Sequence, residues 1–112
     1  MEQWKIDAFN HAEESKPLEC CGILAKKNNK FLYWKCNNVA KDNPEYSFVI
    51  DPLDWADCED NVDEIHGIVH SHPEGEFRFS DNDIASCNNL DVPFYLVEPS
   101  TQSIINIDPQ EL

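Results

Sequence analysis

Basic residues, long apolar runs and paired cysteine motifs are scarce or absent in this sequence of 112 residues. Eight Lys and Arg residues face 22 Asp and Glu residues, which gives a formal net charge of −14. A surface this acidic repels nucleic acid phosphates and anionic lipid, so we expect neither as a partner, and the simplest role of the charge is solubility. No apolar stretch approaches the length of about 20 residues that a membrane helix needs. No basic and apolar leader pattern opens the chain, so we expect neither a signal peptide nor a membrane segment.

The cysteines form no recognisable disulfide or metal-binding pattern. They are an odd set without a Cys-x-x-Cys pair: Cys20, Cys21, Cys36, Cys58 and Cys87. Without a secretion signal, they are best interpreted as reduced thiols in the protein interior. The adjacent Cys20 and Cys21 are poorly placed for a disulfide, because neighbouring strand side chains point to opposite faces. A thiolate nucleophile remains an alternative.

Length and periodicity predict a single α/β (α+β) domain over residues 1–112, with helices packed on a mixed sheet. Apolar residues make up 41% of the chain, which is enough for a folded core. Asp51-Pro52 is a typical helix start, and the Asn-containing link 26–30 is typical of a hairpin turn. Helices are expected over residues 2–14, 52–60 and 80–90, and strands over 19–25, 31–36, 46–50, 65–71, 93–98 and 103–107.

The segment His70-Ser71-His72 carries the strongest chemical signal of the chain. Because alternate side chains of a strand share a face, His70 and His72 point to the same side, with Cα atoms about 6.6 Å apart. Both imidazoles can then reach one ion at Zn–N distances of about 2.0–2.1 Å, while Ser71 points to the opposite face. Taken alone, the pair is explained equally well by two partly exposed strand histidines.

Ser80 and Asp83 follow the loop 73–79 and stand three residues apart at an expected helix start. They share a helix face, and Asp83 would add the carboxylate that completes a three-ligand zinc site with an open fourth position. The same Ser-x-x-Asp pattern is a helix-capping signature, and capping is the better explanation of these two residues alone. The neighbouring histidine pair favours the metal interpretation. His11 and His66 are interpreted instead as a polar-face helix residue and a strand-start or packing residue.

The series His70-x-His72, seven residues, Ser80, two residues and Asp83 resembles, without a gap, the motif of the JAMM (also called MPN+ or JAB) metalloproteases. The segment 17–24, Pro-Leu-Glu-Cys-Cys-Gly-Ile-Leu, is similar to the glutamate-bearing first strand of that family. This resemblance covers nearly the whole chain, from about residue 4 to residue 108. It implies a fold similar to that of cytidine deaminases, with a curved and mostly antiparallel sheet flanked by helices.

The resemblance also implies a set of roles. His70, His72 and Asp83 would hold Zn²⁺ with water as the fourth ligand, Glu19 would be the general base, and Ser80 would help to stabilise the oxyanion. The implied activity is that of a zinc-dependent peptidase or isopeptidase, a hydrolase that cleaves an amide bond through the zinc-bound water. The residues alone do not single out Glu19 among the 22 acidic side chains, since an exposed strand-end glutamate is its ordinary interpretation.

The double cysteine, Asn43-Pro44-Glu45 and the expected helix 51–60 more narrowly resemble the N-terminal domain of the tail assembly protein K family of lambda-like phages. This implies a role in phage tail assembly or host cell-wall processing, in the host cytoplasm or the virion tail. The substrate would be a phage tail protein or a peptidoglycan peptide, and other tail-tip proteins are candidate partners. Such proteins usually carry a second domain resembling NlpC/P60 cysteine peptidases, which we expect to be absent from this chain, so its thiol chemistry is assigned to no cysteine here.

Other functions stay open as alternatives. A non-catalytic MPN-type scaffold would keep the fold, and even the metal, while it binds another tail-tip protein. The complete set of Glu, two His, Ser and Asp favours the enzyme, because a scaffold has no physical need for all five. A zinc deaminase shares the broad fold, but the chain lacks the Pro-Cys-x-x-Cys motif that supplies its ligands. Two histidines and one carboxylate could also hold iron in an oxygenase, an alternative that the resemblance disfavours.

Overall fold

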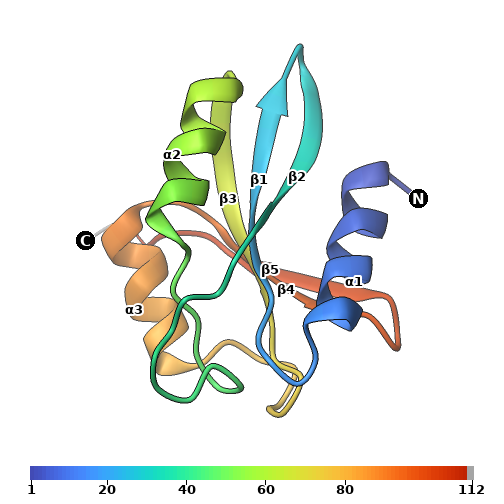
Figure 1. Cartoon of the computed structure of the whole chain (residues 1–112), viewed down its shortest axis with the longest axis vertical. Coiled ribbons are helices and arrows are strands. Elements are labelled where there is room, and N and C mark those ends of the chain that lie inside the picture. The colour runs from blue at the N-terminus through green and yellow to red at the C-terminus, as the bar shows by residue number, and fades with distance from the viewer. Residues whose placement is uncertain (111–112) are drawn as a thin grey trace.

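A five-stranded sheet with helices on both faces makes up residues 1–110, the part of the chain that this computed structural model describes (Figure 1). The strands lie in the order β2-β1-β3-β4-β5; β3 and β4 are parallel, and the other neighbouring pairs are antiparallel. This confirms the predicted α+β class with a mixed, mostly antiparallel sheet. The elements are α1 (Gln3–Ser15), β1 (Cys21–Lys27), β2 (Lys30–Cys36), α2 (Pro52–Asn61), β3 (Glu64–Ser71), α3 (Asp81–Leu90), β4 (Phe94–Glu98) and β5 (Ser103–Ile107).

Local signals in the sequence set several boundaries. The Asp51 side chain accepts a hydrogen bond from the N–H of Leu53 at 2.9 Å, and Pro52 occupies the first position of α2. Asn28 and Asn29 both adopt positive φ angles, 52° and 64°, which is the conformation of a two-residue hairpin turn between β1 and β2. Both features agree with the expectations from sequence. No helix among the described residues is long and apolar enough to span a membrane.

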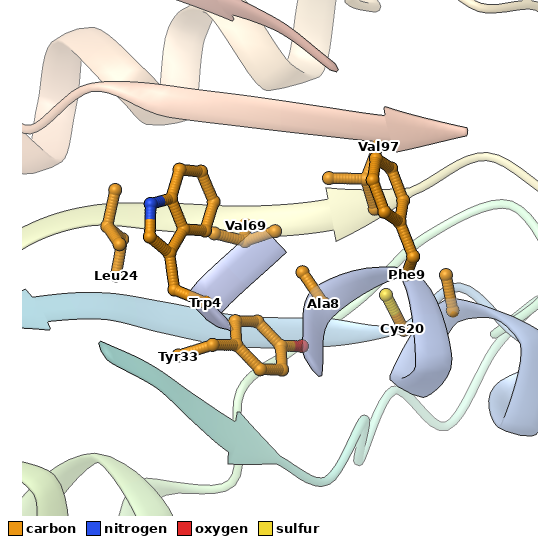
Figure 2. Packing of buried hydrophobic residues seen from close by; sticks show 9 residues of the cluster. Trp4, Ala8, Phe9, Cys20, Leu24, Tyr33, Val69 and Val97 are labelled. Atoms are coloured by element: carbon orange, nitrogen blue, oxygen red, sulfur yellow. The ribbon is translucent and has the colours of Figure 1, made fainter. Parts of the chain in front are cut away.

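Helix α1 covers one face of the sheet. Trp4, Ala8 and Phe9 point from the helix onto strands β1 to β4, where they meet buried residues of the sheet (Figure 2). The position of His11 differs from the sequence expectation, because the residue is 8% exposed rather than on a polar face. Its Nδ1 lies 2.5 Å from the hydroxyl oxygen of Tyr33, a partner 22 residues away that no local pattern could indicate.

Helices α2 and α3 lie on the opposite face (Figure 1). Residues 37–51, which link β2 to α2, also pack on this face, where Phe48 and Ile50 contact two buried apolar clusters. The expected strand over residues 46–50 is wrong, because only Ile50 forms a single bridge, with Asn38. Phe48 and Ile50 pack over the sheet, whereas Val49 between them faces solvent. The segment therefore alternates like a strand, but it does not pair with another strand in a ladder.

The five cysteines are all buried and free, as expected. Cys20 belongs to the cluster beneath α1, whereas Cys21 belongs to a cluster on the opposite face, so the adjacent thiols point apart. Burial raises the pKa of Cys20 to about 11 and that of Cys36 to about 12. These thiols are therefore protonated at neutral pH, which argues against the thiolate nucleophile.

Candidate metal centre and catalytic site

The structure brings the three predicted ligands together where β3 ends and α3 begins. His70 is the penultimate residue of β3, His72 follows the strand, and Asp83 lies in the first turn of α3. One ligand atom from each residue lies within 4.8 Å of the others. Asp83 Oδ2 is 3.2 Å from His70 Nε2 and 3.1 Å from His72 Nε2. These separations are close to the roughly 3.3 Å that tetrahedral geometry requires between ligands bound to zinc at 2.0–2.1 Å. The group could therefore hold a metal ion.

The environment of His70 fits a metal better than a structural histidine. The residue is completely buried, and the rings of Phe48, Phe94 and Phe79 lie around it at centroid distances of 4.8, 5.8 and 6.0 Å. Neither of its ring nitrogens makes a well-aligned hydrogen bond within residues 1–110, although Nε2 lies 3.2 Å from Asp83 Oδ2. An unpartnered buried polar group is costly, and a cation beside Nε2 would satisfy it. Burial also lowers the pKa of His70, which favours the neutral imidazole that metals bind.

His72 and Asp83 are held by contacts outside the ligand set. His72 Nδ1 lies 3.1 Å from the carbonyl oxygen of Glu76, which accepts a hydrogen bond when Nδ1 carries the proton and so leaves Nε2 free for a metal. Burial alone would lower the pKa of His72, but hydrogen bonding to Asp83 and to the Glu76 carbonyl outweighs it and raises the pKa. Burial would raise the pKa of Asp83, but both histidines and the N–H of Ser80 hold it well below its usual range.

Glu19 borders this group and is buried, with 4% of its surface exposed, instead of lying at an exposed strand end. Its Oε2 atom lies 3.9 Å from His72 Nε2. Because Cys20 faces α1, the residues on either side of it, Glu19 and Cys21, point to the opposite face of the sheet, where the predicted ligands also lie. Burial raises the pKa of Glu19 to about 7, and the charge of Asp83 adds to this rise while His72 opposes it.

The helix cap and the candidate metal group, which the sequence left in competition, both occur in the structure and share Asp83. Ser80 forms the cap with it. Its Oγ accepts a hydrogen bond from the N–H of Asp83 at 3.0 Å, and its own N–H donates to Asp83 Oδ2 at 2.9 Å, so the capping box is complete. The same Asp83 carboxylate faces both histidines. A capping hydroxyl acts as an acceptor, so its proton remains available to a substrate. Ser80 is also exposed and lines a cavity together with Glu19.

Asn38 organises the loop beside Glu19, a role that the sequence did not reveal. Its Oδ1 accepts hydrogen bonds from the backbone of Ala40 and Val49 at 3.0 and 3.1 Å. Its Nδ2 lies within donating distance of three carbonyl oxygens: those of Glu19 at 3.1 Å, Pro44 at 3.3 Å and Ser47 at 3.0 Å. No local pattern marks this Asn, because its partners are spread over residues 19–49.

His66 does not join the site. Its ring packs against Phe31 and Tyr95, with centroid distances of 5.1 and 6.4 Å, in agreement with a packing role. The register between β1 and β3 shifts at Leu24 and Ala25, opposite this part of β3. Such an irregularity interrupts the alternation of side chains along the strand. His66 therefore does not share the face of His70, although their positions differ by an even number.

The matched region and the site geometry agree with a known family. A family model described as prokaryotic homologs of the JAB domain matches residues 2–106. The chain belongs to this family. This JAB domain is also 34% identical over 111 residues to the tail tip assembly protein K of Escherichia phage N15. That match covers 98% of this chain and 45% of the phage protein, so the chain spans less than half the length of the curated relative it matches.

A solved structure has a fold similar to that of this chain. The solution structure of a protein from Desulfitobacterium hafniense matches with a TM-score of 0.68 and 19% sequence identity, and covers 95% of this chain and 78% of that one. The family resemblance seen in the sequence is thus confirmed for both the JAB domain and the tail assembly protein. The individual roles of Glu19, Ser80 and the three ligands stay predictions.

Proposed function

We propose that this JAB domain is a zinc-dependent peptidase or isopeptidase that acts in phage tail assembly. The observation that carries the proposal is the convergence of His70, His72 and Asp83 beside a buried Glu19, with no well-aligned hydrogen bond to His70 Nε2 in residues 1–110. These three side chains would hold the metal. Zinc bound there would supply a Lewis acid for the amide carbonyl and a lowered pKa for water.

Glu19 has the properties of a general acid and base. A pKa of about 7 lets its carboxyl group both accept and release a proton near neutral pH. It would accept the proton of the attacking water and then deliver it to the leaving amine nitrogen. Its carboxylate lies 3.9 Å from His72 Nε2, which is farther than the contact between His70 and Asp83. Glu19 therefore lies beside the predicted ligands and is not one of them.

Ser80 would stabilise the charge that develops on the carbonyl oxygen. Its Oγ is fixed by the N–H of Asp83, and its O–H would donate to the oxyanion. Because the helix cap sets the position of this hydroxyl before substrate binds, no reorganisation is needed during the reaction.

Location and partners follow from the phage relative and are part of the proposal. The relative is named as a tail tip assembly protein, so we place this domain in the host cytoplasm or the virion tail, with tail-tip proteins as partners. We further propose that residues 1–112 form a single JAB domain. A non-catalytic scaffold with the same fold is the competing function, and the following experiment separates the two.

The test loads the protein with zinc and incubates it with candidate tail proteins and muropeptides, with products identified by mass spectrometry. Glu19→Gln should keep its zinc and lose cleavage by at least about 10²-fold, because only the base is removed. His70→Ala should lose both zinc and cleavage, whereas the control His66→Ala should keep both. A fully metallated wild type that cleaves nothing would favour the scaffold, and an active Glu19→Gln would remove Glu19 from the mechanism.

A further inference from the structure

An apolar cavity of about 320 Å³ opens beside the candidate metal centre, on the same face of the sheet. Glu19, Ser80 and Asp83 form part of its lining, so it adjoins the position where the scissile amide would lie. Its volume is at the lower end of the range for specific ligand pockets, roughly 300–1,000 Å³. The rest of its wall is mainly apolar and includes Phe48, Ile50, Trp55, Leu90 and Phe94.

A second cavity, of about 580 Å³, extends from the same residues in polar surroundings. It shares Glu19, Tyr46 and Ser80 with the apolar cavity, and its own lining includes Glu76 and Asp81. A substrate amide held between Glu19 and Ser80 would therefore have two unlike environments beside it. One accepts an apolar side chain, and the other accepts polar or charged groups.

The rim of the apolar cavity leaves large apolar side chains in water. Val49 is 53% exposed and Leu90 is 52% exposed, although both line the cavity. Removing apolar surface from water is favourable, so binding of an apolar side chain in the cavity is favoured by burial of that side chain and by burial of Val49 and Leu90. The loop 37–51 forms one wall, and Asn38 holds that loop in place.

The charge of the chain selects among peptides that could enter this cleft. The net charge is −14, and the polar cavity exposes Glu76 and Asp81. Arg78, the basic residue in that lining, is paired with Glu76 at 2.8 Å. A peptide with basic residues is attracted to such a surface. The stem peptides of peptidoglycan carry free carboxylates, which this acidic surface repels, and mostly small side chains, which do not fill the apolar cavity.

On the basis of the peptidase function proposed above, we propose that the substrate is a protein segment with a large apolar residue next to the scissile amide and Lys or Arg residues in its flanks. The apolar side chain, of the size of Leu or Phe, occupies the cavity formed by Phe48, Trp55 and Phe94. The basic flank lies along the polar cavity beside Asp81, since the Glu76 carboxylate is already paired with Arg78. A phage tail protein segment of this composition is the substrate class, and peptidoglycan is not.

Binding to the zinc-loaded Glu19→Gln protein tests this inference without requiring hydrolysis. The probes are short Lys-flanked peptides with a central Leu, Ala or Asp, and a muramyl tetrapeptide. The chain has three Trp residues, so NMR spectra of its indole N–H groups give one signal each for Trp4, Trp34 and Trp55. The Leu peptide should bind at least about tenfold more tightly than the Ala peptide and shift the Trp55 signal, because Trp55 is the Trp that lines the cavity.

Two variants of equal charge separate cavity binding from charge attraction. Leu90→Lys should weaken binding of the Leu peptide at least about tenfold, because it places an ammonium group at the cavity rim. Leu53→Lys is the matched control, since Leu53 is 79% exposed on α2 and does not line the cavity. Tighter binding of the muramyl peptide, an unmoved Trp55 signal or equal effects of the two Lys variants would overturn the inference. Binding as described without cleavage by the wild type would support the cavity and overturn the peptidase proposal.

Discussion

On the α1 face of the sheet, His11 Nδ1 lies 2.5 Å from the Tyr33 hydroxyl, and Ser71 Oγ accepts the N–H of Cys20 at 2.9 Å. On the opposite face, neither ring nitrogen of His70 makes a well-aligned hydrogen bond among residues 1–110, and burial raises the pKa of Glu19 to about 7. The same strands supply both faces, because Ser71 stands next to His70 in β3. Neighbouring residues of one strand thus enter two different polar environments.

This difference separates stability from function. Buried polar groups that find partners within the protein contribute to one well-defined fold. Buried polar groups that find none cost free energy, and they persist where a ligand or a reaction needs them. Among these polar groups, those on the α1 face are partnered, and the unpartnered ones lie at the candidate site beneath α2 and α3. Substitution of a partnered group should therefore lower stability, whereas substitution of a group at the candidate site should mainly lower the proposed activity.

The largest expected effect concerns Ser80, where different substitutions can remove the hydroxyl donor while keeping the helix cap. Ser80→Ala should lower the cleavage rate by about 10²–10³-fold and stability by about 1 kcal/mol, because both the oxyanion donor and the cap are lost. Ser80→Asp should keep near wild-type stability but stay slow, since Asp caps a helix without a hydroxyl donor. Ser80→Thr, which has both groups, is the control. Rates come from peptide cleavage and stabilities from urea unfolding. Fast cleavage by Ser80→Asp would limit Ser80 to capping.

Local chemistry explains why much of this site could be predicted from the sequence. Strand alternation alone places His70 and His72 on one side, and the Ser-x-x-Asp pattern alone locates the start of α3 at Ser80. The structure adds that one carboxylate, Asp83, takes part in both the cap and the ligand group. Neither pattern needs distant residues, so both survive in the folded protein.

Tertiary contacts explain what the sequence could not predict. The burial of Glu19 depends on loop 37–51, whose path depends on the side chain of Asn38. The burial of His11 depends on Tyr33, and the expected strand over residues 46–50 fails because its alternation comes from packing. Each of these outcomes needs a partner at least eleven residues away along the chain. Only the family resemblance drew attention to Glu19.

The next effect in size is that of Asn38, whose amide oxygen and amide nitrogen both make hydrogen bonds in the loop beside the candidate site. Asn38→Ala should lower the free energy of unfolding by roughly 2–4 kcal/mol, because the carbonyls of Pro44 and Ser47 and the N–H of Val49 lose their partner. Chemical denaturation measures this change. The matched control is Asn61→Ala, since Asn61 donates to the Asp57 carbonyl on the exposed side of α2. Equal losses in the two variants would show that Asn38 does not organise the loop.

A smaller effect is expected where a polar pair on the α1 face is broken. Tyr33→Phe should lower stability by about 1–3 kcal/mol, because it leaves the buried Nδ1 of His11 without its partner. Zinc content should not change, since the pair lies on the other face of the sheet. Adding His11→Leu to Tyr33→Phe should recover part of the loss, because both polar groups are then gone. Urea unfolding of the two variants and the wild type measures these changes in stability. An unchanged stability of Tyr33→Phe would show that the pair does not stabilise the fold.

The smallest expected effect has the opposite sign and concerns Glu19 in the metal-free protein. Its pKa is about 7 in the folded state and 4.5 as the reference value, so the folded protein binds the extra proton between these pH values. The wild type should therefore lose stability as pH rises from 4.5 to 7, because the unfolded chain ionises more easily. Glu19→Gln lacks this loss, so its stability advantage should be greater at pH 8 than at pH 5, by an amount on the order of 1 kcal/mol. Denaturation with a chelator present measures the difference, and Glu59→Gln, on the exposed side of α2, is the control. An advantage of Glu19→Gln that is the same at both pH values would mean that folding of the apo protein does not raise the pKa of Glu19.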